Sequence, residues 1–369
     1  MSSTATAGAV AAGLVVGGIG GYLAGQSTAP GATDGAVAEP GILGRPLKIG
    51  IVAPGAANDY GWNQQGIEGL QKLKDTMGAE VTVLESMGYG PNAVSALETL
   101  ASRDVDLIIA HAGGYLDDAF NVAQSEFSGR VLYAASGLLA WPEERKAQYL
   151  IPEKTTYYHL ESQEASYLAG VAAALMSKSK VIGEIVSAEP VNWNIQTGGF
   201  IHGVHDTDPN ASLLYSVVGS YEDATKGREM TLAQIAQEAD VIFGQGDGTS
   251  FGYLQACSDE DKWFIDVIGD KRSVDQAGVL LTSVLIDFSV AYQRAAADIY
   301  NGTFGANPYP LTLSNGGSDL LTLNPAVPQS VVSQVEQAKQ KILNGQIKVP
   351  RFLTAEEVKA ALKDMFGLG

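Results

Sequence analysis

Short apolar runs alternate with longer amphipathic stretches along the chain after Pro46. The first round of apolar runs covers residues 47–53, 81–84, 106–110, 131–135 and 157–160, and the second covers 181–186, 213–218, 240–243, 264–268 and 279–286. Stretches such as 63–77 and 92–103 have helical periodicity. Apolar strands separated by helices are typical of parallel sheets covered on both faces. Two rounds of about five strands predict two similar α/β lobes, because a single twisted sheet rarely exceeds about ten strands.

Glycine, aromatic and polar residues follow most of these predicted strands. The strand ends read PGAANDYGWN, HAGGYLDD and SGLLAW in the first round, and SAEPVNWN, GQGDGTS and GDKRS in the second. One such cluster is explained by turn chemistry alone. Ligands of open α/β sheets bind at the carboxyl ends of the strands, so six clusters together predict a binding site there.

The first 46 residues differ from the rest of the chain. Residues 4–25 contain no charged side chain and consist mainly of Ala, Gly, Val, Leu and Ile. A helix of this length could cross the ~30 Å hydrocarbon core of a bilayer. We interpret residues 1–25 as an uncleaved membrane signal-anchor, with a cleaved signal or a disordered leader as alternatives. Residues 26–46 have a linker composition. This layout predicts a protein anchored by its N-terminus at the extracytoplasmic face of the cell membrane.

Charge and chemistry narrow the function further. The 369 residues include 23 Lys plus Arg and 41 Asp plus Glu, a formal net charge of −18, which disfavours nucleic-acid binding. The one cysteine, Cys257, excludes an intrachain disulfide and a cysteine-rich metal site. His202 and His205 are three residues apart on a predicted helix, and we interpret them as a surface pair rather than metal ligands. Catalytic and metal-binding motifs are absent from the sequence, so neither an enzyme nor a cofactor is expected.

Several segments have the order and spacing of one known family. They are Asp59-Tyr60-Gly61-Trp62-Asn63-Gln64, Glu68-Gly69-Leu70, DLIIA from Asp106, YLAGVAAALMSKS from Tyr167, ADVIFGQGDGT from Ala239, LLTSV from Leu280, IYNGTF from Ile299 and NGQIKVP from Asn344. Over residues 47–350 the chain resembles the basic membrane protein family, the purine-nucleoside receptors of ABC importers.

The resemblance implies two doubly wound parallel-sheet lobes joined by a three-crossing hinge, the type I periplasmic-binding-protein fold. Residues 47–158 plus 286–312 would form one lobe, and 159–285 plus 313–369 the other. It also implies a monomer that closes around a purine nucleoside (adenosine, guanosine or inosine) and delivers it to ABC permease subunits. A same-fold receptor for a sugar or another polar metabolite remains the alternative. Less favoured are a nucleoside-cleaving enzyme and a sensor domain with a separate signalling partner.

The resemblance also assigns roles to individual residues. Trp62 would stack on the base from the first lobe, and Trp193 would supply the opposing ring. Asp59 and Asn63 would flank Trp62 as polar contacts or turn-formers. The remaining carboxylates are Asp117 for a base N–H, Asp270 for the ribose hydroxyls, and Asp247 as a further contact.

For four of these residues, a purely structural role is the alternative to contact with a ligand. Trp62 and Trp193 could be core aromatics at the bases of loops. Asp59 could be a helix N-cap. Asp270 could brace a turn with Lys271 or Arg272.

Two positions depart from the family pattern. Family receptors usually carry a Lys after the Thr-Ser-Val strand end, where this chain has Ile286 and then Asp287. Either Lys271 or Arg272 replaces that Lys, or the ligand is held differently. In addition, Ser136-Gly137 stands where Asp-Gly is common.

Overall fold

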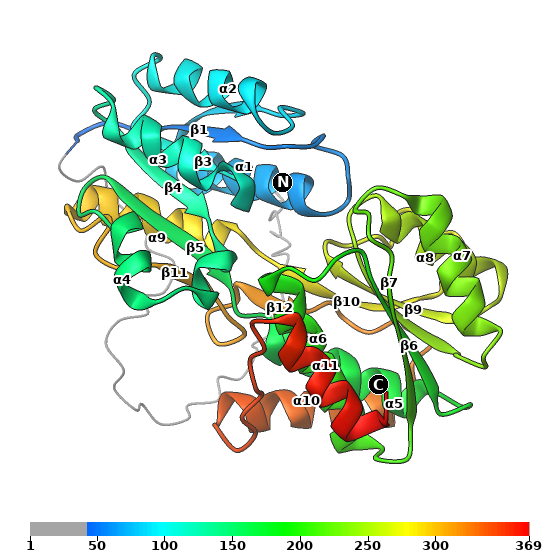
Figure 1. Ribbon diagram of the computed structural model, residues 1–369. Helices are drawn as coiled ribbons and strands as arrows, with labels where there is room; N and C mark the ends of the chain where they lie inside the picture. The colour runs from blue at the N-terminus through cyan, green and yellow to red at the C-terminus, as the bar shows by residue number, and fades with distance from the viewer. Residues whose placement is uncertain (1–42, 369) are drawn as a thin grey trace, which may run out of the picture. The chain divides into compact units, whose positions relative to one another are not determined.

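Two six-stranded sheets form the framework of the protein (Figure 1). The computed structural model describes residues 43–368. The predicted anchor, residues 1–25, and most of the predicted linker lie outside the described residues. Within residues 43–368, every helix is too short or too polar to cross a lipid bilayer.

The first sheet is entirely parallel and has the order β11-β5-β4-β3-β1-β2. Its strands are β1 (Lys48–Val52), β2 (Glu80–Leu84), β3 (Leu107–Ala110), β4 (Arg130–Ala134), β5 (Thr155–Leu160) and β11 (Tyr309–Leu311). β1 pairs with β2 on one side and with β3 on the other, so Ile49 lies opposite both Val81 and Leu107. The strand order therefore reverses at β1, which is where ligands bind in doubly wound sheets.

The second sheet repeats this arrangement in the order β12-β10-β9-β8-β6-β7. Its strands are β6 (Val181–Val186), β7 (Ser212–Val217), β8 (Val241–Gln245), β9 (Trp263–Ile268), β10 (Leu280–Ile286) and β12 (Ser318–Leu320). All pairs are parallel except that of β10 with the edge strand β12. Here the order reverses at β6. The structure confirms the predicted fold of two parallel-sheet lobes.

Helices cover both faces of each sheet (Figure 1). In the first lobe, α1 (Trp62–Met77) and α9 (Ser289–Asn301) pack together on one face, and α2 (Pro91–Ala101) and α3 (Leu116–Gln124) on the other. Short turns there are η1 (Gly113–Tyr115), η2 (Ser136–Ala140), α4 (Glu143–Lys146) and η3 (Ala147–Tyr149). In the second lobe, α7 (Ala224–Ile235) and α8 (Thr249–Asp259) cover one face, and α5 (Gln163–Met176) and α6 (Val191–Thr207) the other. Outside this second pair lie α10 (Gln329–Leu343) and α11 (Ala355–Phe366).

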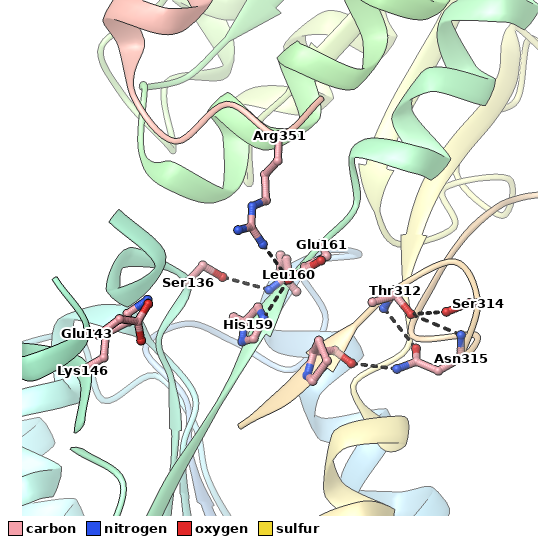
Figure 2. A network of polar contacts seen from close by, with 11 residues as sticks. Ser136, Glu143, Lys146, His159, Leu160, Glu161, Thr312, Ser314, Asn315 and Arg351 are labelled. Carbon is pink, nitrogen blue, oxygen red and sulfur yellow. Dashed lines mark hydrogen bonds and ion pairs between the residues drawn. The ribbon is translucent and has the colours of Figure 1, made fainter. Parts of the chain in front are cut away.

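The chain crosses between the sheets three times: from β5 to α5, from β10 to α9, and from β11 to β12. Polar contacts fix these crossings (Figure 2). Glu161 accepts hydrogen bonds from Arg351 Nη1 at 2.7 Å and from His159 Nε2 at 3.1 Å. In the β11–β12 crossing, Asn315 Nδ2 donates to Pro310 O at 2.8 Å. Side-chain hydrogen bonds therefore hold the β5–α5 and β11–β12 crossings.

Helices α5 and α6 approach each other unusually closely because glycines lie at their contact. A Cβ atom on Gly199 of α6 would come within 2.0 Å of the Gln163 carbonyl oxygen, and one on Gly203 within 2.1 Å of the Tyr167 carbonyl oxygen. Both neighbours are backbone atoms, so they cannot swing away. The glycines thus set the separation of the two helices on which the second sheet rests.

We expect Gly199→Ala to lower the free energy of unfolding by about 1–3 kcal/mol, because the added methyl group forces the helices apart. In an isolated helix the same change would be stabilising. Denaturant unfolding of the purified protein measures the difference. Gly137→Ala is the matched control, because a Cβ there would meet no atom within 4 Å. Equal stabilities for the two variants would show that the α5–α6 contact relaxes freely.

Candidate functional site

A cavity of about 580 Å³ lies at the carboxyl ends of the strands and is lined by both lobes. Its size is ordinary for a small-molecule site. First-lobe lining residues are Pro54, Gly55, Trp62, Asn63, Tyr89, Ala112, Gly113, Gly114, Leu116, Ala134, Ala135, Ser136, Gly137, Leu138 and Trp141. Second-lobe lining residues are Pro190, Val191, Asn192, Trp193, Tyr221, Glu222, Asp247 and Ile268. Of the seven residues proposed from the sequence, Trp62, Asn63, Trp193 and Asp247 line this cavity.

Trp62 is held in one orientation by a buried histidine. The indole Nε1 donates a hydrogen bond to the His111 carbonyl oxygen at 2.8 Å, and the two rings stack with centroids 4.9 Å apart. His111 Nε2 lies 2.9 Å from the Trp62 carbonyl oxygen, so this nitrogen carries the proton. His111 Nδ1 then accepts from the hydroxyls of Tyr158 and Tyr292. Burial lowers the pKa of His111 to about 4, so the imidazole beneath Trp62 is neutral.

Side-chain hydrogen bonds within the β1–α1 loop hold its conformation. The Asp59 carboxylate accepts hydrogen bonds from the backbone N–H groups of Gly61, Asn63 and Gln64 at 2.9–3.0 Å. It also accepts from Asn63 Nδ2 at 2.7 Å, while Asn63 Oδ1 accepts from Gly55 N at 2.9 Å. Asp59 therefore caps the N-terminus of α1 and lies outside the cavity lining. Asn63 reaches the cavity, but its side-chain amide is already engaged within the loop.

The second lobe contributes aromatic rings from two loops. Trp193 lies in the first turn of α6 and is 4% exposed. Its ring centroid is 5.1 Å from that of Tyr221, with the planes tilted by 52°. Tyr221 follows β7 and is 43% exposed. The two side chains form a partly exposed aromatic wall across the cavity from the first-lobe residues.

Asp247 follows β8 and turns its carboxylate toward the first lobe. A Cβ atom placed on Gly61 would lie 3.8 Å from Asp247 Oδ1. Burial raises the pKa of Asp247 to about 7, assisted by the charges of Asp59 and Glu222 and partly offset by Lys271. Asp247 is therefore poised between its neutral and ionised forms near neutral pH.

A buried polar cluster supports the loop that carries Asp247. Gln245, at the end of β8, donates from Nε2 to Glu184 Oε1 at 3.1 Å and to Thr197 Oγ1 at 2.8 Å. Thr197 donates in turn to Glu184 Oε1 at 2.6 Å and lies one turn beyond Trp193 on α6. Burial raises the pKa of Glu184 to about 8, so this side chain is mostly protonated at neutral pH. The cluster ties the Asp247 loop to the helix that presents Trp193.

Two more of the proposed carboxylates, in addition to Asp59, lie away from the cavity lining. Asp117 is exposed and accepts a hydrogen bond from the Tyr149 hydroxyl at 2.9 Å. Asp270 accepts from the backbone N–H of Arg272 at 2.9 Å and from its guanidinium. Partial burial alone would raise the pKa of Asp270, but the contacts with Arg272 lower it overall. Asp270 thus braces the turn after β9, the structural role that the sequence left open.

The family Lys has no basic replacement in the cavity wall. Ile286 is buried in β10, and Asp287 pairs with Lys72 at 2.7 Å. Lys271 is 1% exposed, pairs with Asp266 at 2.5 Å, and lies 3.3 Å from the Tyr60 carbonyl oxygen. Among residues 43–368, no Lys, Arg or His side chain lines the cavity.

Six polar or aromatic lining residues were not proposed from the sequence: Tyr89, Ser136, Trp141, Asn192, Tyr221 and Glu222. Trp141 and Asn192 belong to the strand-end clusters SGLLAW and SAEPVNWN. Tyr89 lies five residues after β2, and Tyr221 and Glu222 lie four and five residues after β7. Applying the strand-end rule to the edge strands β2 and β7 as well would have identified Tyr89, Tyr221 and Glu222.

Ser136, where the family commonly has Asp, links the cavity wall to the hinge. It lines the cavity at the start of η2, and its Oγ accepts a hydrogen bond from Leu160 N at 3.1 Å (Figure 2). Leu160 is the last residue of β5, directly before the first crossing. This hydrogen bond connects the cavity wall to the residue that precedes the first crossing.

Known proteins share both this sequence and this fold. The transcriptional activator protein med of Bacillus subtilis is 22% identical over 292 residues, which covers 79% of this chain and 87% of that protein. A purine-binding protein of Brucella abortus is 25% identical over 308 residues, which covers 82% of each chain. The solved structure of an ABC transporter solute-binding protein from Conexibacter woesei superimposes with a TM-score of 0.71 at 22% identity. That match covers 83% of this chain and 99% of the other, and it supports the fold alone.

The family match covers most of the described body. Residues 47–352 match the model of the Bmp family, described as ABC transporter substrate-binding protein PnrA-like. This range includes every residue that lines the cavity. The chain therefore belongs to the Bmp family of PnrA-like ABC transporter substrate-binding proteins, which are extracytoplasmic solute receptors and not enzymes.

Proposed function

We propose that this receptor captures a purine nucleoside between its two lobes and delivers it to the permease of an ABC importer. The observation that carries the proposal is the placement of aromatic rings from opposite lobes around one cavity, with Trp62 on one side and Trp193 and Tyr221 on the other. Stacking on an aromatic ring contributes about 1–3 kcal/mol per base. Because the cavity lies between the two lobes, a single base can stack on aromatic rings from both lobes.

Polar groups around the rings suit the rest of a nucleoside. Asp247 offers a carboxylate to hydroxyl or N–H donors, and charge-assisted hydrogen bonds are roughly twice as strong as neutral ones. Asn192 and the exposed Glu222 add further polar atoms. This set replaces Asp270, which the resemblance had assigned to the ribose, because Arg272 already occupies that carboxylate.

Closure of the lobes would report occupancy to the permease. The cavity wall is shared between lobes that three crossings join, so a ligand that contacts both stabilises the closed arrangement. The Lys271 and Gly269 segment already meets the Tyr60 carbonyl of the first lobe in this structure. Such contacts would complete a surface for the permease only in the closed state.

We further propose that the receptor acts as a monomer held to the membrane through residues 1–25. The support is the uncharged apolar composition of residues 4–25 and the linker composition that follows it. An anchored receptor remains near its permease without any additional contact.

A first experiment tests the aromatic wall. We expect Tyr221→Ala to raise the Kd for adenosine about 5- to 150-fold, the equivalent of about 1–3 kcal/mol of lost stacking. Because Tyr221 is 43% exposed, the stability of the ligand-free protein should change little. Leu343→Ala, equally exposed at 43% and outside the cavity, is the control for calorimetric titration. An unchanged Kd in Tyr221→Ala would remove this ring from the site.

A ligand screen tests the substrate class. Adenosine, guanosine or inosine at about 100 times its Kd should stabilise the folded protein by about 2.7 kcal/mol and raise its melting temperature. Free ribose and glucose should leave the melting temperature unchanged. A shift with sugars alone would favour the sugar receptor that the missing Lys keeps open. Release of free base during the incubation would instead indicate an enzyme.

A further inference from the structure

The ionisable side chains that line the cavity are all acids. Its ionisable lining residues are the carboxylic acids Asp247 and Glu222 and the phenols Tyr89 and Tyr221. In the part of the chain that the structure describes, no basic side chain lines the cavity. The nearby cation, Lys271, is committed to Asp266 at 2.5 Å and to the Tyr60 carbonyl oxygen.

Asp247 lies near acidic side chains from three other segments of the chain. Asp59 faces it from the β1–α1 loop, Glu222 from the β7–α7 loop and Asp266 from β9, and all three raise its pKa. Lys271 alone opposes them. Burial and these neighbouring charges are the main causes of the raised pKa of Asp247. Desolvating a carboxylate without a partner is costly, so a ligand that supplies positive charge here gains more than a neutral one.

The rest of the wall is suited to a flat cation. Five rings line the cavity, namely those of Trp62, Tyr89, Trp141, Trp193 and Tyr221. The Arg145 guanidinium already lies over the Trp141 ring, 3.5 Å from its centroid, so the other four rings remain for a ligand cation. Cations are attracted to the faces of such rings, most strongly to Trp and more so where water is excluded. A phosphorylated ligand, in contrast, would place its negative charge beside Asp247 and Glu222.

Building on the proposed function, we propose that the cavity selects a nucleoside whose base carries a positive charge, such as one methylated at a ring nitrogen. The charged base lies among the aromatic rings and pairs with Asp247, while Glu222 adds attraction at the rim. Neutral nucleosides fit the same space but leave the carboxylates without a cation.

The proposal couples binding to the proton of Asp247. A cationic ligand favours the ionised carboxylate, so it lowers the pKa of Asp247 from about 7 and binds more tightly as pH rises through that value. The phenols of Tyr89 and Tyr221 have pKa values raised by burial and by Asp247, so they stay neutral in this range. A neutral nucleoside that only accepts a proton from Asp247 would show the opposite trend.

The test compares three ligands on the full chain by calorimetric titration. 1-Methyladenosine carries a cationic base at neutral pH, adenosine is neutral, and N6-methyladenosine is neutral with the same added methyl group. We expect 1-methyladenosine to bind roughly tenfold or more tightly than either neutral ligand at low salt. Its affinity should rise between about pH 6 and pH 8.

Two variants test whether Asp247 and Glu222 cause the preference for a cationic nucleoside. Asp247→Asn should reduce the ratio of cationic to neutral affinity roughly tenfold and flatten the pH dependence, and Glu222→Gln should reduce the ratio less. Glu229→Gln removes one exposed negative charge from α7 outside the cavity and should leave the ratio unchanged.

The outcomes separate this inference from the proposed function. If adenosine binds as tightly as 1-methyladenosine, or if Asp247→Asn keeps the preference, the charge selectivity is wrong while nucleoside capture stands. If none of the three ligands binds, nucleoside capture itself fails and the selectivity falls with it.

Discussion

The carboxyl ends of parallel strands meet at one edge of a sheet, and in this protein two such edges face the same cavity. Because the order reverses at β1 in one sheet and at β6 in the other, the loops beside those strands splay apart and leave space between them. Loops after β1, β3 and β4 and loops after β6, β7 and β8 therefore contribute to one wall. Three crossings join the two sheets.

Much of the wall is fixed before any ligand arrives. Trp62 is held from below by the neutral His111, whose position requires Gly66, because a Cβ there would come within 2.2 Å of the imidazole. On the other side, Gln245 and Thr197 connect the Asp247 loop to the Trp193 helix through a mostly protonated Glu184. Side chains that are already ordered lose little entropy on binding, so more of the stacking energy appears as affinity.

The sequence predicted the sheets well because buried strands have a strong local signature. All ten predicted strands are present, with ends within two residues of those expected. The missed strands, β11 and β12, are three residues long and lie at sheet edges, and Pro310 and Asp319 interrupt any apolar run. Strand-end position also brought Trp62, Trp193 and Asp247 to the cavity.

The sequence did not predict which way each proposed carboxylate points. That direction depends on which neighbouring group the carboxylate bonds to, and the strand-end pattern carries no information about those neighbours. Arg272, two residues away, takes Asp270, and the Tyr149 hydroxyl, 32 residues away, takes Asp117. The Asp59 carboxylate accepts hydrogen bonds from backbone N–H groups in the first turn of α1, the helix that follows it.

The same competition explains how an acidic cavity can exist beside a lysine. Lys271 is two residues from Gly269, where the lobes touch, yet its side chain is 1% exposed and its ammonium group lies against the fully buried Asp266. Removing Asp266 from water without a cation would cost several kcal/mol, so the internal pair outweighs any contact that the lysine could make in the cavity. With Lys271 held there, and Ile286 at the end of the neighbouring strand, Lys271 opposes the negative neighbours of Asp247 only from outside the cavity lining. The polarity of the binding site thus follows from an ion pair in the core of the second lobe.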